Sequence, residues 1–177
     1  MRVEYVHFPL HPETPPEGRR LADVFGGGAQ AEARIAASHR RLEALAKAEG
    51  LPYGNRTMTY NSRLAQELGA WAETQGRGEA FHDAVFRAYF AEAKDISNVA
   101  VLIDLAAAAG LDRAAAAEVL EKRTFRKAID DDWARSFRDG IDSVPTFAAG
   151  GHVLVGAQPY PELEALVKAA GARRRRG

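Results

Sequence analysis

The feature that most constrains the fold of this chain is a long helical middle between two extended segments. Residues 30–139 contain about six stretches in which apolar residues recur every three to four positions, the period of an amphipathic helix. Before them, Val3–Phe8 alternates as a strand does; after them, TFAA-Gly150-Gly151-HVLV predicts a β-hairpin, followed by a helix from about Pro161 to Ala170. Strands at both ends that share one sheet predict an α/β fold with a helical insertion.

Capping residues and glycines mark where the helices begin and end. A helix from Gln30 to Glu49 stops at Gly50, and a later one begins at Asn61 or Ser62. Further caps are expected at Ser97 or Asn98 and at Asp112. The apolar stripes that these helices share are Ile35, Leu42 and Leu45; Leu64, Leu68, Trp71 and Ala72; Phe81, Val85, Phe86, Tyr89 and Phe90; Phe125, Ile129, Trp133 and Phe137.

The charge balance argues against nucleic-acid or membrane partners. Lysine plus arginine and aspartate plus glutamate both number 24, so the formal net charge is zero. The one basic run, Arg173–Arg176, is typical of a solvated tail. Because the sequence has neither a long apolar run nor a signal-like N-terminus, we expect a cytoplasmic protein.

The chain contains no cysteine, which excludes disulfides, thiolate nucleophiles and cysteine metal sites within it. The five histidines have no ligand spacing, and no serine lies in a nucleophile-elbow motif. We therefore predict no catalytic residue, no cofactor and no metal site in this sequence.

The stretch DSVPTFAAGGHVLVGAQPY, from Asp142 to Tyr160, is the strongest candidate for a binding site. Pro145 opens the first hairpin strand, where its missing N–H is tolerated. Spacing alone favours an ordinary trans proline, because only about 5–6% of X-Pro bonds in folded proteins are cis.

Several segments together resemble the DsbA-like thioredoxin superfamily and, within it, the FrnE-type disulfide oxidoreductases. They are FPLHPETPPEGRRLADVFGG, NSRLAQELGAWAETQG, FHDAVFRAYFAEAKDISNVAVLIDLAAAAGLD and DSVPTFAAGGHVLVGAQPYPELEALV. The resemblance runs from about Val3 to Ala170. It implies a thioredoxin-like domain formed by residues 1–18 and 140–177, with a helical insertion domain over residues 19–139.

The resemblance also implies where a substrate binds. Val144-Pro145 matches the family's cis-proline loop, whose backbone pairs with an extended substrate chain. Val144, Pro145 and Thr146 are therefore the expected substrate-binding residues, with Asn61 and Arg63 bordering the groove. The implied partner is an extended peptide or protein substrate, bound as an added β-strand.

The chain departs from the family at its start. Family members begin with a strand and a Cys-x-x-Cys helix, and the resemblance places that strand between Val3–Phe8 and Val144–Ala148. Its lack would leave backbone groups unpaired and apolar side chains exposed. We therefore expect either a native protein longer than this sequence or a partner, such as a second copy or another strand, that completes the sheet.

Two functions follow, and they leave open whether this chain is an enzyme. The first is a thiol–disulfide oxidoreductase homologue whose redox segment is absent here, so that the chain as written is redox-inactive. The alternative is a redox-dead module that binds peptides or a partner. A glutathione-dependent isomerase is less favoured, because Gly156-Ala157-Gln158-Pro159 stands where those enzymes show Gly-x-Asp-Arg.

Overall fold

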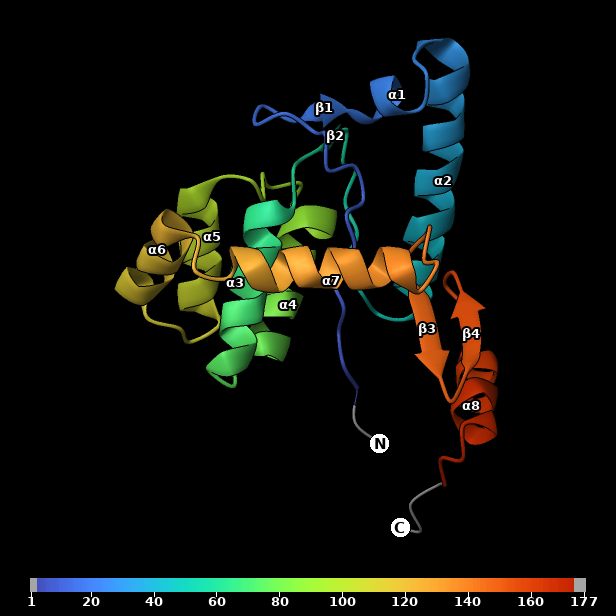
Figure 1. Ribbon diagram of the computed structural model, residues 1–177. Helices are drawn as coiled ribbons and strands as arrows, with labels where there is room; N and C mark the ends of the chain where they lie inside the picture. The colour runs from blue at the N-terminus through green and yellow to red at the C-terminus, as the bar shows by residue number, and fades with distance from the viewer. Residues whose placement is uncertain (1–2, 174–177) are drawn as a thin grey trace. The chain divides into compact units, whose positions relative to one another are not determined.

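The computed structural model describes residues 3–173 of the chain. These residues form two compact units (Figure 1). The first unit combines the described residues up to Leu10 with those from Asp130 onward, and the second consists of residues 11–129. Arg174–Arg176 of the basic run lie outside the described residues.

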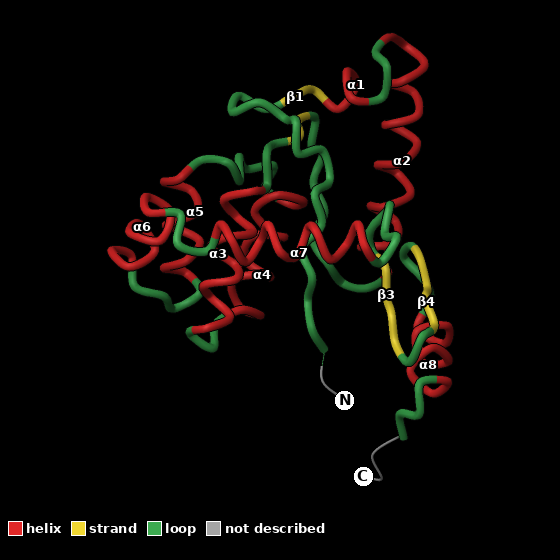
Figure 2. Tube along the Cα trace, viewed as in Figure 1, coloured by secondary structure: helices red, strands yellow, loops and turns green. Residues whose placement is uncertain are grey.

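The second unit is mainly helical. Its two short strands, β1 (Arg19–Arg20) and β2 (Met58–Thr59), pair antiparallel. Its helices are α1 (Leu21–Val24), α2 (Gly28–Ala48), α3 (Arg63–Thr74), α4 (Gly78–Phe86), the π-helical turn η1 (Arg87–Ala91), α5 (Val99–Ala108), α6 (Arg113–Lys122) and the start of α7 (Arg126–Arg138). Figure 2 shows how small the strand regions are beside the helices.

The core of the second unit lies among helices α3, α4, α5 and α6. Leu68, Phe81 and Leu102 are at most 1% exposed. The predicted stripe on α3 is confirmed for Leu68, Trp71 and Ala72, which are all buried. A single contiguous cluster of apolar side chains therefore holds these four helices together.

Helix α2 packs differently from the helices of this core. Its predicted stripe includes Leu42 and Leu45, yet these side chains are 40% and 49% exposed. Ala31 is the one fully buried residue of the helix. The predicted helix is present, but among the described elements α2 contacts chiefly α1. Most of the apolar side of α2 is therefore uncovered.

The first unit contains the hairpin that the sequence predicts. Strands β3 (Thr146–Ala149) and β4 (His152–Val155) pair antiparallel, and helix α8 (Tyr160–Ala169) follows them. Gly150 and Gly151 form the turn with φ angles of 55° and 80°. Positive φ at both positions gives the turn the twist of a tight hairpin, which explains the Gly-Gly pair.

The strand predicted over Val3–Phe8 is wrong. A strand needs a hydrogen-bonded neighbour, and no described segment pairs with these residues. Side chains attach the segment to α7 instead. The Asp132 carboxylate accepts a 3.1 Å hydrogen bond from the backbone N–H of His7 and lies 2.7 Å from Nδ1 of the His7 ring. Glu4 forms an ion pair with Arg135.

The first unit has almost no core of its own. Pro9 and Ser136 are its only buried residues among those that the structure describes. Its exposed large apolar side chains are Val3, Tyr5, Val6, Leu10, Phe137, Val144, Phe147, Val153, Val155 and Tyr160. Where such groups share one face, as Val153 and Val155 do on β4, they are typical of a surface that binds another polypeptide.

Candidate substrate-docking site

Residues 144–146 form a fixed loop at the start of β3. The Val144–Pro145 peptide bond is cis. The Thr146 hydroxyl donates a 2.7 Å hydrogen bond to the carbonyl of Ser143, and the N–H of Gly156 donates one of 2.7 Å to the carbonyl of Pro145. Val144 precedes the β3–β4 ladder and is 44% exposed. Within residues 3–173, its backbone N–H and carbonyl form no backbone hydrogen bond.

One edge of β3 carries unpaired backbone groups. Opposite residues in an antiparallel ladder alternate between pairs that exchange hydrogen bonds and pairs that do not. Pro145 and Gly156 are a bonded pair, so Phe147 and Ala149 also form bonded pairs with β4. The backbone N–H and carbonyl groups of Thr146 and Ala148 therefore point away from β4. No other described strand pairs with that edge. Together with Val144, it offers a row of donors and acceptors to an incoming strand.

The two faces of the hairpin differ in how they are covered. Thr146, Ala148, Val153 and Val155 share one face; Phe147, Ala149, His152 and Leu154 share the other. Helix α8 packs on the hairpin, and the partly buried Leu154 places it on the second face. On the first face Val153 and Val155 remain 58% and 48% exposed. This bare apolar face borders the open edge of β3.

Asn61 lies in the second unit and has a local structural role. Its side-chain amide donates 3.1 Å hydrogen bonds to the carbonyls of Pro12 and Thr14. Its carbonyl oxygen accepts a 2.9 Å bond from the N–H of Arg63, at the start of α3. These contacts occupy the side chain, and its predicted role at a substrate groove stays a prediction.

Arg63 also belongs to the second unit, where it forms part of a buried charge cluster. Its Nε donates to the Glu67 carboxylate at 2.7 Å, and Arg123 donates to the same carboxylate twice at 2.6 Å. Glu67 is 1% exposed. Burial opposes its charge, but the hydrogen bonds from Arg123 and Arg63 outweigh that effect and hold the pKa of Glu67 below its usual range.

Two kinds of feature are absent from residues 3–173. In that part of the chain, no helix is long and apolar enough to cross a membrane. Nor do three or more histidine, aspartate or glutamate side chains gather there in a way that could hold a metal ion. The cytoplasmic location remains a prediction.

The fold and the proline-led hairpin define the class of this protein. Residues 1–168 match the family described as the DSBA-like thioredoxin domain. The chain therefore belongs to that family, and its fold is the α/β DsbA-like thioredoxin fold that the sequence predicts.

Two relatives are similar to this chain. The crystal structure of the probable DsbA oxidoreductase SCO1869 from Streptomyces coelicolor superposes with a TM-score of 0.84 at 27% identity, covering 97% of this chain and 76% of that one. The uncharacterized protein YwbO of Bacillus subtilis (strain 168) is 33% identical over 95 residues, which are 53% of this chain. The match spans about half of YwbO, 48% of its length.

The loop at residues 144–146 could be predicted from the sequence, but the bare face beside it was not predicted. The sequence predicts a strand that contains Val153 and Val155, but not which face of the hairpin stays uncovered. The alternation of the hairpin, combined with the single helix that follows it, is the signal that could have identified this face.

Proposed function

We propose that this chain binds an extended polypeptide along the open edge of β3 and does not itself exchange disulfides. The observation that carries the proposal is the row of outward-turned backbone groups at Val144, Thr146 and Ala148. A peptide that adds to this edge gains backbone hydrogen bonds and continues the sheet. Thiol chemistry requires a cysteine, and the sequence contains none.

The bare face supports the same proposal. A bound polypeptide that continues past β3 would cover Val153 and Val155, whose exposed apolar surface favours contact with another apolar surface. The bound chain is thus expected to be extended at the β3 edge and apolar where it crosses the face. A second copy of this chain is one polypeptide that could occupy the site.

We further propose that the binding serves disulfide exchange of the FrnE type, with thiols supplied by residues outside this sequence. Family membership and the likeness to SCO1869, which is named as a DsbA oxidoreductase, support this step. The intact mass of the protein from its native host tests it. A mass well above 19.2 kDa with a cysteine pair is expected, whereas a mass of 19.2 kDa would leave only the binding function.

The binding test uses S-alkylated insulin B chain, an unfolded polypeptide without free thiols, labelled for fluorescence anisotropy. Ala148→Pro removes an N–H that faces the open edge of β3 and should weaken binding about tenfold, because the peptide carbonyl that would accept from this N–H is left unpaired. Pairing with β4 should survive, because that N–H does not take part in it.

The matched control is Val153→Pro, which removes the corresponding N–H from the outer edge of β4. Binding should stay within about twofold of the parent protein, since no peptide hydrogen bond is lost and the proline ring keeps an apolar group on the face that the polypeptide would cover. Equal losses in both variants would contradict the β3 edge as the site.

A second assay measures the reduction of insulin by dithiothreitol. This chain should not accelerate the reduction, because it contains no cysteine. Catalytic turnover would contradict the assignment of redox chemistry to thiols that this sequence lacks.

A further inference from the structure

The first unit contains a strand-like segment that pairs with no described strand. Residues 3–6 belong to no helix or strand, and Val3, Tyr5 and Val6 are 62%, 58% and 36% exposed. Within residues 3–173, the backbone groups of Val3, Glu4 and Val6 form no backbone hydrogen bond. Valine and tyrosine favour strands. Residues 3–6, which we call the arm, therefore offer a strand-forming backbone to a partner.

The arm is attached to α7 most firmly at His7, which follows it. The Ser136 hydroxyl donates a 3.1 Å hydrogen bond to the carbonyl of His7, and the Asp132 carboxylate accepts one from its N–H. Within the arm, Glu4 pairs with Arg135, but the two side chains are 59% and 45% exposed. Exposed ion pairs contribute at most about 1 kcal/mol. Breaking this pair therefore costs little, and the contacts of His7 can remain when the arm moves.

The open edge of β3 is the acceptor that such a strand needs. Thr146 and Ala148 turn their N–H and carbonyl groups outward, and β3 is four residues long, which is the length of the arm. Edge strands that stay unpaired are usually blunted by charged residues, bulges or an internal proline. Thr146–Ala149 contains none of these, because Pro145 precedes the strand. The edge is therefore suited to pairing with another strand.

Within one chain, the arm and the edge do not pair. Both belong to the first unit, yet the arm contacts α7 and no ladder joins it to β3. In two copies related by a two-fold axis, the arm of each copy can pair with the edge of the other, which closes the assembly at two chains. The formal net charge of zero favours such self-association, because the two copies do not repel each other overall.

We infer that a second copy of this chain occupies the β3 edge through its residues 3–6, in a reciprocal exchange of arms. The inference rests on the proposed function, since it concerns the same edge, and it adds a means of regulation. The dimer covers the edge, so an incoming polypeptide must displace the arm. Dilution below the concentration of half-dimerisation opens the edge, and polypeptide binding and amide exchange at β3 are measured there.

Sedimentation velocity tests the dimer. The parent chain should pass from monomer to dimer as its concentration rises to the millimolar range. Ala148→Pro should raise the dissociation constant of the dimer about a hundredfold, because each of two symmetric edges loses a hydrogen bond worth about tenfold. Val153→Pro is the matched control and should stay within about fourfold, since the outer edge of β4 is not used. A parent chain that stays monomeric at millimolar concentration, or equal shifts in the two variants, would overturn the inference.

Paramagnetic broadening identifies the segment that occupies the edge. The sequence has no cysteine, so Val3→Cys provides a single attachment site for a nitroxide. This spin-labelled chain carries no ¹⁵N and is mixed with ¹⁵N-labelled parent chain, so that all broadening observed is intermolecular. The amides of Thr146 and Ala148 should broaden. Broadening at Thr146 should persist when the ¹⁵N-labelled chain is Val153→Pro and disappear when it is Ala148→Pro. A dimer whose β3 amides stay sharp would overturn the arm as the occupant.

S-alkylated insulin B chain separates this inference from the proposed function. At saturation it should convert the dimer into monomers with bound polypeptide. Binding of the B chain by a chain that never dimerises would overturn the exchange of arms and leave the proposed function intact. A dimer with broadened β3 amides and no binding of the B chain would support the exchange of arms and contradict the proposed function.

Discussion

At the scale of single residues, the buried charge of Glu67 contributes to stability. It is 1% exposed and its carboxylate binds both Arg63 and Arg123. Glu67→Gln leaves two guanidinium groups facing a neutral amide, so we expect the free energy of unfolding to fall by about 3 kcal/mol in urea titrations. The control is Glu118→Gln, which breaks an exposed pair with Lys122 and should have little effect. Equal losses in the two variants would contradict a structural role for the cluster.

The same carboxylate predicts how stability depends on pH. Its pKa is lower in the folded chain than the roughly 4.3 of an unfolded glutamate. A lowered pKa gives stability that is fully present above pH 4.3 and is lost as the pH falls through the folded value. Chemical unfolding from pH 7 down to pH 3 should therefore show a steeper loss below about pH 4.3 for the parent chain than for Glu67→Gln. Parallel curves for the parent chain and Glu67→Gln would contradict a lowered pKa of Glu67 in the folded chain.

At the scale of elements, α5 depends on its N-terminal cap. The Asn98 carbonyl oxygen accepts hydrogen bonds from the N–H groups of Ala100 at 2.9 Å and Val101 at 3.2 Å. Asn98→Ala leaves these donors without a protein partner and should lower the free energy of unfolding by about 1 kcal/mol. Asn98→Asp keeps an acceptor at a helix N-terminus and should be close to neutral; a loss as large as that of alanine would argue against capping.

The helices could be predicted from the sequence because their signals are local. The caps at Asn98 and Asp112 and the stripe of Leu68 and Trp71 concern residues within a few positions of one another, and the structure confirms them. The hairpin was predictable for the same reason, since Gly150-Gly151 determines both its turn and its register.

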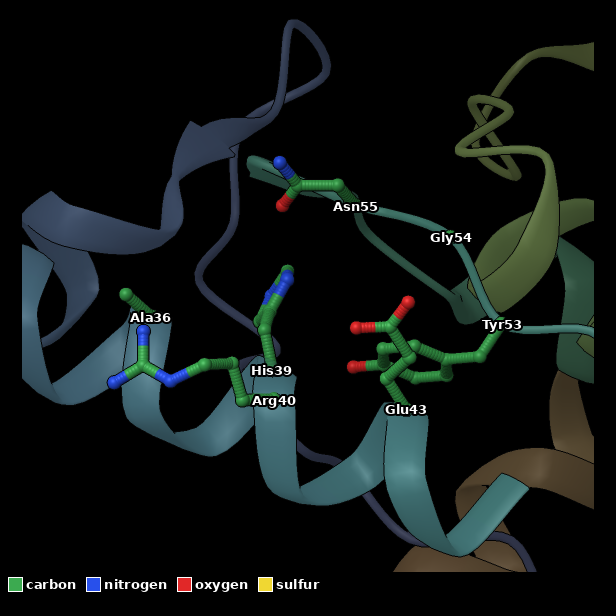
Figure 3. Close-up of a pocket in the computed structure, with 7 residues that line it drawn as sticks. All are labelled: Ala36, His39, Arg40, Glu43, Tyr53, Gly54 and Asn55. Atoms are coloured by element: carbon green, nitrogen blue, oxygen red, sulfur yellow. The ribbon is translucent and has the colours of Figure 1, made fainter. Parts of the chain in front are cut away.

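Features that depend on distant neighbours were not predictable in this way. Val3–Phe8 alternates like a strand, but alternation cannot say whether a partner strand lies beside it. The exposure of Leu42 depends on what packs against α2, which its own pattern does not specify. Tyr53 returns to Glu43 after the end of α2, where both residues line one cavity (Figure 3), and no motif in the sequence marks that approach.

At the scale of the whole molecule, apolar burial is unevenly divided between the two units. The second unit has a contiguous core, whereas in the first only Pro9 and Ser136 are buried among the described residues. Opening free energies follow local burial, so the amides of β3, β4 and α8 should exchange with deuterium well before those of α3 and α5. A bound polypeptide that completes the sheet should reduce this difference.

Residue-resolved amide hydrogen exchange, with and without S-alkylated insulin B chain, tests the central claim most directly. Polypeptide binding at the open edge of β3 predicts that the amides of Val144, Thr146 and Ala148 become protected, while those of the outer edge of β4 exchange as before. Unchanged exchange at these three amides under saturating polypeptide, or protection confined to the second unit, would contradict the claim.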